Sequence, residues 1–194
     1  MLRLDVVIGP NGAGKSTFVR YTLGQALPPG VMFVNADEIA ARRWPEDPQG
    51  HSYDAARIAA ETRDALLVAG EPFIAETVFS HPSKLELIDA AHAAGYTVFV
   101  HVLLVPEELS VARVRYRVAA GGHDVPEMKI RNRYQRLWPL VVDAALRADS
   151  ATFYDNSEVG GPQVVAQIAG GAPVGTIRWP DWAPGALMTA WPAT

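Results

Sequence analysis

The sequence predicts an α/β fold of three layers, with a mainly parallel β-sheet covered by helices on both faces. Short, almost wholly apolar runs of strand length recur along the chain, and stretches with the apolar spacing of helices separate them. Strands that are apolar throughout are typical of parallel sheets, because both of their faces are buried. In such a sheet we expect the functional site at the carboxyl ends of the strands.

The first half of the chain alternates between strand and helix signals. Strands are expected at residues 4–8, 31–34 and 73–75. Helices are expected at residues 17–27, before Pro28-Pro29-Gly30, and at about 53–69, before Gly70. The second half continues the alternation. A helix from Pro82 carries an apolar stripe made of Leu85, Ile88, Ala91 and Gly95.

The longest predicted strand covers residues 96–105, and the last covers 151–154. Two helices begin at Pro106 and Pro126, where proline and the glutamates after it suit a first helical turn. The second of these helices should bend or restart around Pro139. The tail, about 172–194, holds three of the five tryptophans, whose indoles we expect to pack on the domain.

The composition indicates one globular domain over residues 1–194. The chain is 49% hydrophobic and 20% charged, and its formal net charge is −4. This balance disfavours a protein that binds DNA or a membrane surface. Cysteine is absent, which excludes disulfides and thiolate metal sites. The start of the chain lacks the apolar stretch of a signal peptide, and His101 interrupts the longest apolar run, so we expect a cytoplasmic protein.

The segment between the first strand and the first helix has the pattern G-x-x-x-x-G-K-[ST] of a phosphate-binding loop. Its glycines let backbone N–H groups converge on phosphate oxygens. Lys15 is expected to reach the β- and γ-phosphates, and Ser16 to bind Mg²⁺. The residues expected to bind the nucleotide are Asn11, Gly12, Ala13, Gly14, Lys15, Ser16 and Thr17. The motif in this context predicts a P-loop NTPase fold.

Several classes of P-loop protein are disfavoured by what the chain lacks. There is no N-K-x-D element for reading guanine, no LSGGQ-like signature, and no Asp-Glu pair at the end of strand 96–105. ATP is therefore expected rather than GTP. A small kinase remains, which would transfer phosphate from ATP to a small acceptor beneath a basic lid.

Candidate acceptor residues follow the second and third strands. Asp37 suits a base for the acceptor hydroxyl or a carboxylate that orients a metal, and it equally suits the N-cap of the next helix. Glu76 and Thr77 could hold the acceptor, or could be solvated loop residues.

Six arginines gather within 24 residues, on either side of Gly121-Gly122. They are Arg113, Arg115, Arg117, Arg131, Arg133 and Arg136. A helix–loop–helix lined with arginine over about 113–136 predicts a lid that neutralises charge on the transferred phosphoryl group. Arg113 and Arg117 share a helix face. His123 and Arg133 are further candidates for contact with the substrate.

Five segments, GPNGAGKST, NADEIA, FIAETVFS, GGHDVPEMKIRNRY and YDNS, together resemble the zeta-toxin-like P-loop kinases, particularly their compact bacterial members. The resemblance runs from Val6 to about Ser157. It implies that Asp37 is the base for a sugar hydroxyl and that Glu76 and Thr77 contact the acceptor. It also implies phosphate contacts from Arg117 and Arg131, or from Arg113 or Arg133 in a shifted register, and a place near adenine for Asn156.

The resemblance implies an Mg²⁺·ATP-dependent kinase of a small hydroxylated acceptor, with UDP-N-acetylglucosamine first among the candidates and an antitoxin protein as a partner. The chain is shorter than the well-known zeta toxins, so other acceptors stay open. One alternative is a kinase of another metabolite or of an antibiotic. Another is a nucleotide-gated ATPase that binds RNA and has no small-molecule kinase activity.

Overall fold

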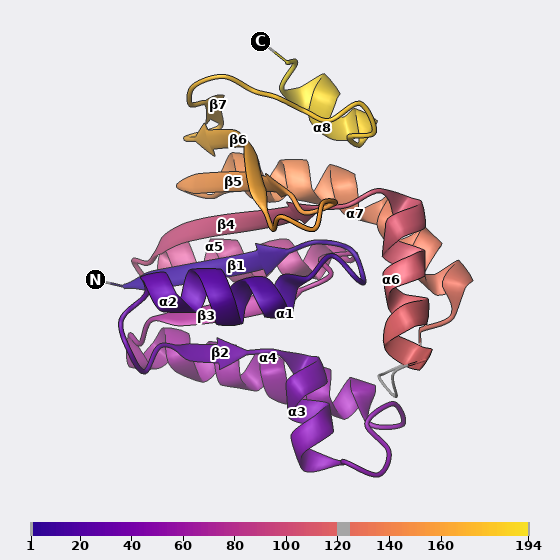
Figure 1. Cartoon of the computed structure of the whole chain (residues 1–194). Helices are drawn as coiled ribbons and strands as arrows, with labels where there is room; N and C mark the ends of the chain where they lie inside the picture. The colour runs from indigo at the N-terminus through magenta and orange to yellow at the C-terminus, as the bar shows by residue number, and fades with distance from the viewer. Residues whose placement is uncertain (1, 120–124, 194) are drawn as a thin grey trace.

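The computed structural model describes residues 2–119 and 125–193, which form a seven-stranded sheet in the order β2-β3-β1-β4-β5-β6-β7 (Figure 1). The strands are β1 (Arg3–Ile8), β2 (Met32–Val34), β3 (Phe73–Thr77), β4 (Thr97–Leu104), β5 (Ser150–Asp155), β6 (Gln163–Ala169) and β7 (Ala172–Pro173). The first five are parallel to one another, and β6 and β7 are antiparallel additions. The predicted, mainly parallel sheet is confirmed.

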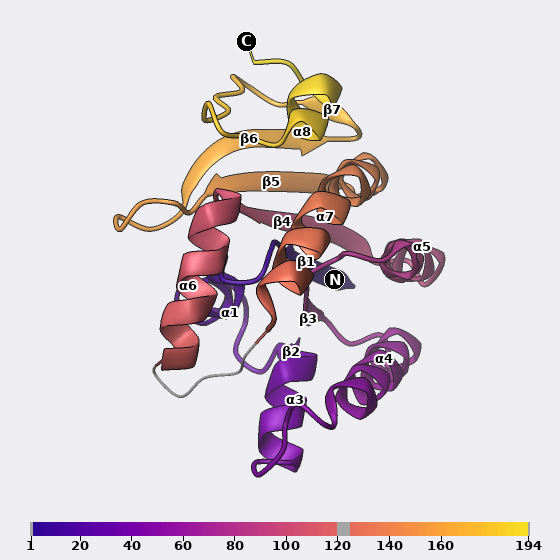
Figure 2. The same ribbon diagram turned by 90° about the vertical axis from the view of Figure 1, so that its right-hand side faces the viewer.

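Helices cover both faces of this sheet (Figure 2). One face is covered by α1 (Lys15–Phe18), a π-helical turn (Val19–Leu23) and α2 (Gly24–Ala26), which follow one another without a break. The other face is covered by α4 (Ser52–Ala69), α5 (Leu85–Ala93) and α7 (Glu127–Arg147). Side chains of β1 alternate between the two cores: Val7 packs with Phe18, whereas Val6 and Ile8 pack in the larger core on the opposite face. The three-layer P-loop NTPase fold is thereby confirmed.

Two further helices lie near the carboxyl ends of the parallel strands (Figure 1). They are α3 (Ala36–Arg43), after β2, and α6 (Glu107–Ala119), after β4. A short 3-10 turn (Pro82–Lys84) precedes α5. Together α6 and α7 form the arginine-rich helical hairpin that was predicted as a lid. No described helix has the length and apolarity needed to cross a membrane.

Three local predictions need correction. Residues 17–27 are not one regular α-helix, because Gly24 N–H donates to Val19 O and widens a turn to π geometry. Helix α5 ends at Ala93, so Gly95 (φ +81°) lies beyond the apolar stripe and turns the chain toward β4. Helix α7 does not restart at Pro139, since the buried residues on either side of this proline hold a single helix against the sheet, while the alternative of a bend there stays a prediction.

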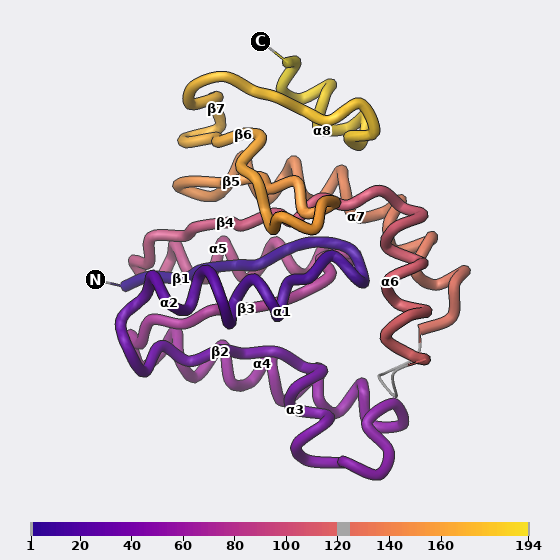
Figure 3. The backbone as a smooth tube through the Cα atoms, in the orientation of Figure 1, coloured from indigo at the N-terminus to yellow at the C-terminus, as the bar shows by residue number. Residues whose placement is uncertain are grey.

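The C-terminal tail packs on the sheet as expected, but it is preceded by a strand, β6, that the sequence analysis missed. β6 pairs antiparallel with β5, and the chain then runs back over this edge of the sheet to α8 (Gly185–Ala190) (Figure 3). The indoles of Trp179 and Trp191 lie against Phe153 of β5, with ring centroids 5.3 and 5.8 Å away. Trp179 Nε1 also donates to Trp191 O. The expected packing of these indoles is confirmed.

Candidate active site

The phosphate-binding loop joins β1 to α1 at the carboxyl edge of the sheet, and Lys15 is its central cation. The Lys15 side chain is buried and its Nζ donates to Pro10 O (3.0 Å). Burial lowers the pKa of Lys15; the charges of Glu76 and Asp37 act to raise it, and those of Arg117 and Arg133 act to lower it. The charges of two predicted carboxylates and of two predicted lid arginines thus act on the pKa of Lys15.

A hydrogen-bonded chain runs from the loop to the start of α3. Ser16 Oγ and Asn35 Nδ2 both donate to Glu76 Oε2, each at 2.8 Å. The Asn35 side chain in turn accepts from Asp37 N (2.7 Å) and Glu38 N (3.3 Å), which caps α3. The first turn of α1 and the ends of β2 and β3 therefore share one polar network.

Asn35 is the member of this network that sequence reasoning missed. It is 4% exposed, and the signal was available, since Asn directly before a helix is a preferred N-cap. The N-cap interpretation of Asp37 is wrong, because Asn35 occupies that position. Asp37 lies instead in the first turn, where its side chain is exposed.

The donor set around Ser16 fits Mg²⁺. The described residues contain no group of three or more His, Cys, Asp or Glu side chains that could enclose a metal. Mg²⁺ does not need such a group, since it is usually bound by one or two protein oxygens, substrate phosphates and waters. The Ser16 hydroxyl and the Glu76 carboxylate, 2.8 Å apart, are hard oxygen donors of that kind.

The Thr77 hydroxyl has a local role in the structure. It accepts from Phe79 N (3.1 Å), and Phe79 (φ 59°) is the one non-glycine residue with a positive φ in the described part of the chain. Thr77 thus stabilises the turn after β3. Its predicted contact with the acceptor stays a prediction.

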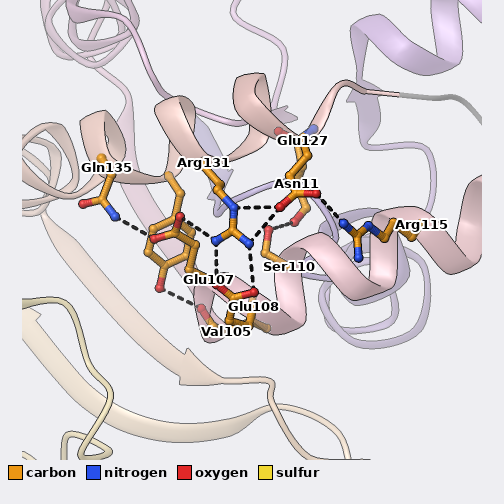
Figure 4. Close-up of polar contacts among 10 residues, drawn as sticks. Asn11, Val105, Glu107, Glu108, Ser110, Arg115, Glu127, Arg131 and Gln135 are labelled. Atoms are coloured by element: carbon orange, nitrogen blue, oxygen red, sulfur yellow. Dashed lines mark hydrogen bonds and ion pairs between the residues drawn. The ribbon is translucent and has the colours of Figure 1, made fainter.

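The lid arginines divide into groups with different partners. Arg131 bonds to three glutamates, Glu107, Glu108 and Glu127, which also lie on α6 and α7 (Figure 4). Arg115 pairs with Glu127 as well. These contacts lower the pKa of Glu108 and Glu127. The structure therefore places Arg131 in a network that joins the two lid helices, while Arg117 and Arg133 are the lid arginines whose charges act on Lys15.

Arg113 and Asn156 lie on the outer side of the phosphate-binding loop. Arg113 donates to Asn156 O (2.9 Å) and Ser157 O (3.3 Å). Asn156 Nδ2 donates to Ala13 O (2.8 Å). Asn156 is thus brought to the loop, and its predicted place near adenine stays a prediction. His123 belongs to residues 120–124, outside the described part of the chain.

Comparisons with known proteins agree with this geometry. Residues 4–147 match the profile of a protein family described as AAA domain. A relative from Haemophilus influenzae, itself described only as an uncharacterized protein, is 27% identical over 127 residues, which cover 65% of this chain and 88% of the relative.

Two solved structures have a similar fold. A crystal structure of AvrRxo1-ORF1:-ORF2 with ATP aligns with a TM-score of 0.68 at 16% identity, over 89% of this chain and 60% of that chain. A structure from the PezAT chromosomal toxin–antitoxin system of Streptococcus pneumoniae aligns with a TM-score of 0.63 at 14% identity, over 85% of this chain and 71% of that chain. This chain thus spans less than two thirds of the AvrRxo1 chain. At these identities the likeness concerns the fold, and the zeta-toxin-like assignment stays a prediction.

Proposed function

The chain belongs to the AAA domain family, and from this premise we propose that it is an Mg²⁺·ATP-dependent phosphotransferase that acts on a hydroxyl group of a small acceptor. The observation that carries the proposal is the network around Glu76 Oε2. It joins the phosphate-loop hydroxyl of Ser16 to Asn35, which in turn holds the backbone of Asp37. The nucleotide side and the acceptor side of a kinase site are thereby linked through one carboxylate oxygen.

The chemistry assigned to the site is an in-line phosphoryl transfer. The acceptor oxygen forms a bond to the γ-phosphorus, the bond from that phosphorus to the β,γ-bridging oxygen breaks, and Asp37 takes the proton of the acceptor hydroxyl. Lys15 binds the β- and γ-phosphates, while Arg117 and Arg133 neutralise charge on the transferred group. Ser16 would hold Mg²⁺, with Glu76 next to it, and the bound ion would neutralise phosphate charge.

The finer parts of the proposal come from the sequence resemblance and from the names of the structural neighbours. UDP-N-acetylglucosamine is the first acceptor to test, because the segments around Asp37 and Glu76 resemble those of zeta-toxin-like kinases. An antitoxin protein is proposed as a partner because one neighbour comes from a toxin–antitoxin system.

The test is phosphoryl transfer from labelled ATP to a panel of UDP-sugars, nucleosides and sugars, with the purified full chain. We expect one acceptor class to become labelled, and Asp37→Asn to abolish labelling while ATP still binds. Asp64→Asn, an exposed carboxylate on α4, serves as the matched control and should retain activity. ATP hydrolysis that no acceptor stimulates and that Asp37→Asn leaves unchanged would contradict the proposal.

A further inference from the structure

Three carbonyl groups of the phosphate-binding loop, those of Pro10, Asn11 and Ala13, accept hydrogen bonds from named side chains. A loop whose N–H groups converge on phosphate must turn its carbonyl groups outward, and those groups need partners where water is excluded. Pro10 O accepts from Lys15 Nζ (3.0 Å) and Ala13 N (3.2 Å). The carbonyls of Asn11 and Ala13 accept from side chains outside the loop.

The two outside donors come from separate elements. Ser110, on the first turns of α6 and fully buried, donates its hydroxyl proton to Asn11 O (2.5 Å; Figure 4). Asn156, directly after β5, donates from Nδ2 to Ala13 O (2.8 Å). Arg113, three residues after Ser110, bonds to the Asn156 carbonyl. We call Ser110, Arg113 and Asn156 the brace.

Two glycines of the loop leave the space that the brace occupies. A Cβ on Gly12 would lie 2.8 Å from Ser110 O and 3.2 Å from Arg113 Cβ. A Cβ on Gly14 would lie 2.7 Å from Asn156 Nδ2. Both glycines also have positive φ, +74° and +85°. Glycine at these positions thus permits close contact with the brace as well as the loop's backbone conformation.

From these contacts we infer that Ser110, Arg113 and Asn156 are positioning residues for phosphate binding. From the start of α6 and from the end of β5, these side chains hold the loop's carbonyl groups away from the nucleotide. The loop N–H groups are therefore already directed at the phosphates when the nucleotide arrives. The inference rests on the nucleotide-binding part of the proposed function and does not depend on the acceptor.

Asn156 distinguishes this inference from the expectation that it lies near adenine. A residue that acts on the loop should matter equally for ATP and for inorganic tripolyphosphate, which has no nucleoside. A residue that contacts adenine should matter for ATP alone. The ratio of the two affinities therefore separates a loop-positioning role from a nucleoside contact.

The experiment measures Kd values for ATP and for tripolyphosphate by displacement of a fluorescent ATP analogue from the full chain with Mg²⁺ present. The variants are Ser110→Ala, Asn156→Ala and Arg113→Ala, with Arg113→Lys as the conservative change. Gln167→Ala on β6 and Arg57→Ala on α4, both exposed, are the matched controls. Circular dichroism and thermal melts establish that each variant is folded.

We expect Ser110→Ala and Asn156→Ala each to weaken both ligands by about tenfold, because a polar backbone group loses its partner. Arg113→Ala should weaken both by a smaller factor, since it acts through Asn156, and Arg113→Lys should lie between it and the wild type. The controls should stay within about twofold of the wild type.

Two results would overturn the inference: unchanged tripolyphosphate affinity in folded Ser110→Ala and Asn156→Ala, or an Asn156→Ala loss confined to ATP. If Ser110→Ala does not fold, Asn156 and Arg113 still decide the outcome, because both side chains are only half-buried. Failure of the proposed function looks different: the wild type would bind ATP, the brace variants would weaken that binding, and no acceptor would be phosphorylated.

Discussion

Replacing Asn35 with alanine should destabilise the protein and remove the hydrogen-bonded link between Glu76 and the start of α3. The Asn35 side chain donates one hydrogen bond to the carboxyl group of Glu76 and accepts two from the start of α3. Loss of an N-cap costs about 1 kcal/mol, and loss of a hydrogen bond to a charged group costs about 1.5–3 kcal/mol. We therefore expect Asn35→Ala to lower the free energy of unfolding by about 2.5–4 kcal/mol.

Urea unfolding monitored by circular dichroism measures this loss of stability. A second variant separates the contribution of the N-cap from that of the hydrogen bond to Glu76. Asn35→Asp keeps a capping oxygen but replaces the Nδ2 donor with a carboxylate facing Glu76, so it should retain the cap and lose the contact between strands. Asn132→Ala, exposed on α7, is the matched control and should change stability by less than about 0.5 kcal/mol. A loss below about 1 kcal/mol in Asn35→Ala, or wild-type stability in Asn35→Asp, would refute the reasoning.

Three further outcomes are expected. Burial acts to raise the pKa of Asp5, but hydrogen bonds from Arg3 and His101 outweigh it and lower that pKa below its unfolded value. The ionised Asp5 therefore stabilises the fold above about pH 4, and this stabilisation is lost as pH falls further. Urea unfolding between pH 7 and 3 should show that Asp5→Asn loses less stability in acid than the wild type, and an equal loss of stability would contradict this expectation. Trp191→Ala removes an indole that is 3% exposed and should lower the free energy of unfolding, measured with urea, by about 3–5 kcal/mol. A loss below about 1 kcal/mol would show that the C-terminal segment adds little to the core. Arg131→Ala should speed amide hydrogen exchange in α6 and α7. Because the ion pairs of Arg131 are solvent-accessible, the free energy of global unfolding should change by less than about 1 kcal/mol. Unchanged exchange would mean that the glutamate network does not hold α6 and α7 together.

The main elements of the fold could be predicted from sequence because their signals are local. The phosphate-loop motif requires glycine, lysine and serine at fixed spacing, and the parallel strands are apolar on both faces. β6 escaped prediction, although buried and exposed residues alternate over its second half, because the strands expected from the sequence were those that are apolar throughout. The π-helical turn escaped too, since it depends on one bond between Gly24 and Val19 inside an otherwise helical pattern.

The roles of the polar side chains were harder to predict than the elements that carry them. Sequence alone placed six arginines in the predicted lid, and it could not say that Arg131 would bond to glutamates while the charges of Arg117 and Arg133 act on Lys15. It named Asp37 and Glu76, but it missed Asn35, which joins their elements.

What the sequence by itself determined is the phosphate-loop motif and the alternation of the parallel strands with the helices between them, because both depend on neighbours in the chain. What only the tertiary structure decided is which side chain meets which partner across the sheet edge. Ser16 and Glu76 are 60 positions apart, and Asn156 and Ala13 are 143 positions apart. Such contacts follow from the register of parallel strands, which brings the ends of distant strands to one edge of the sheet.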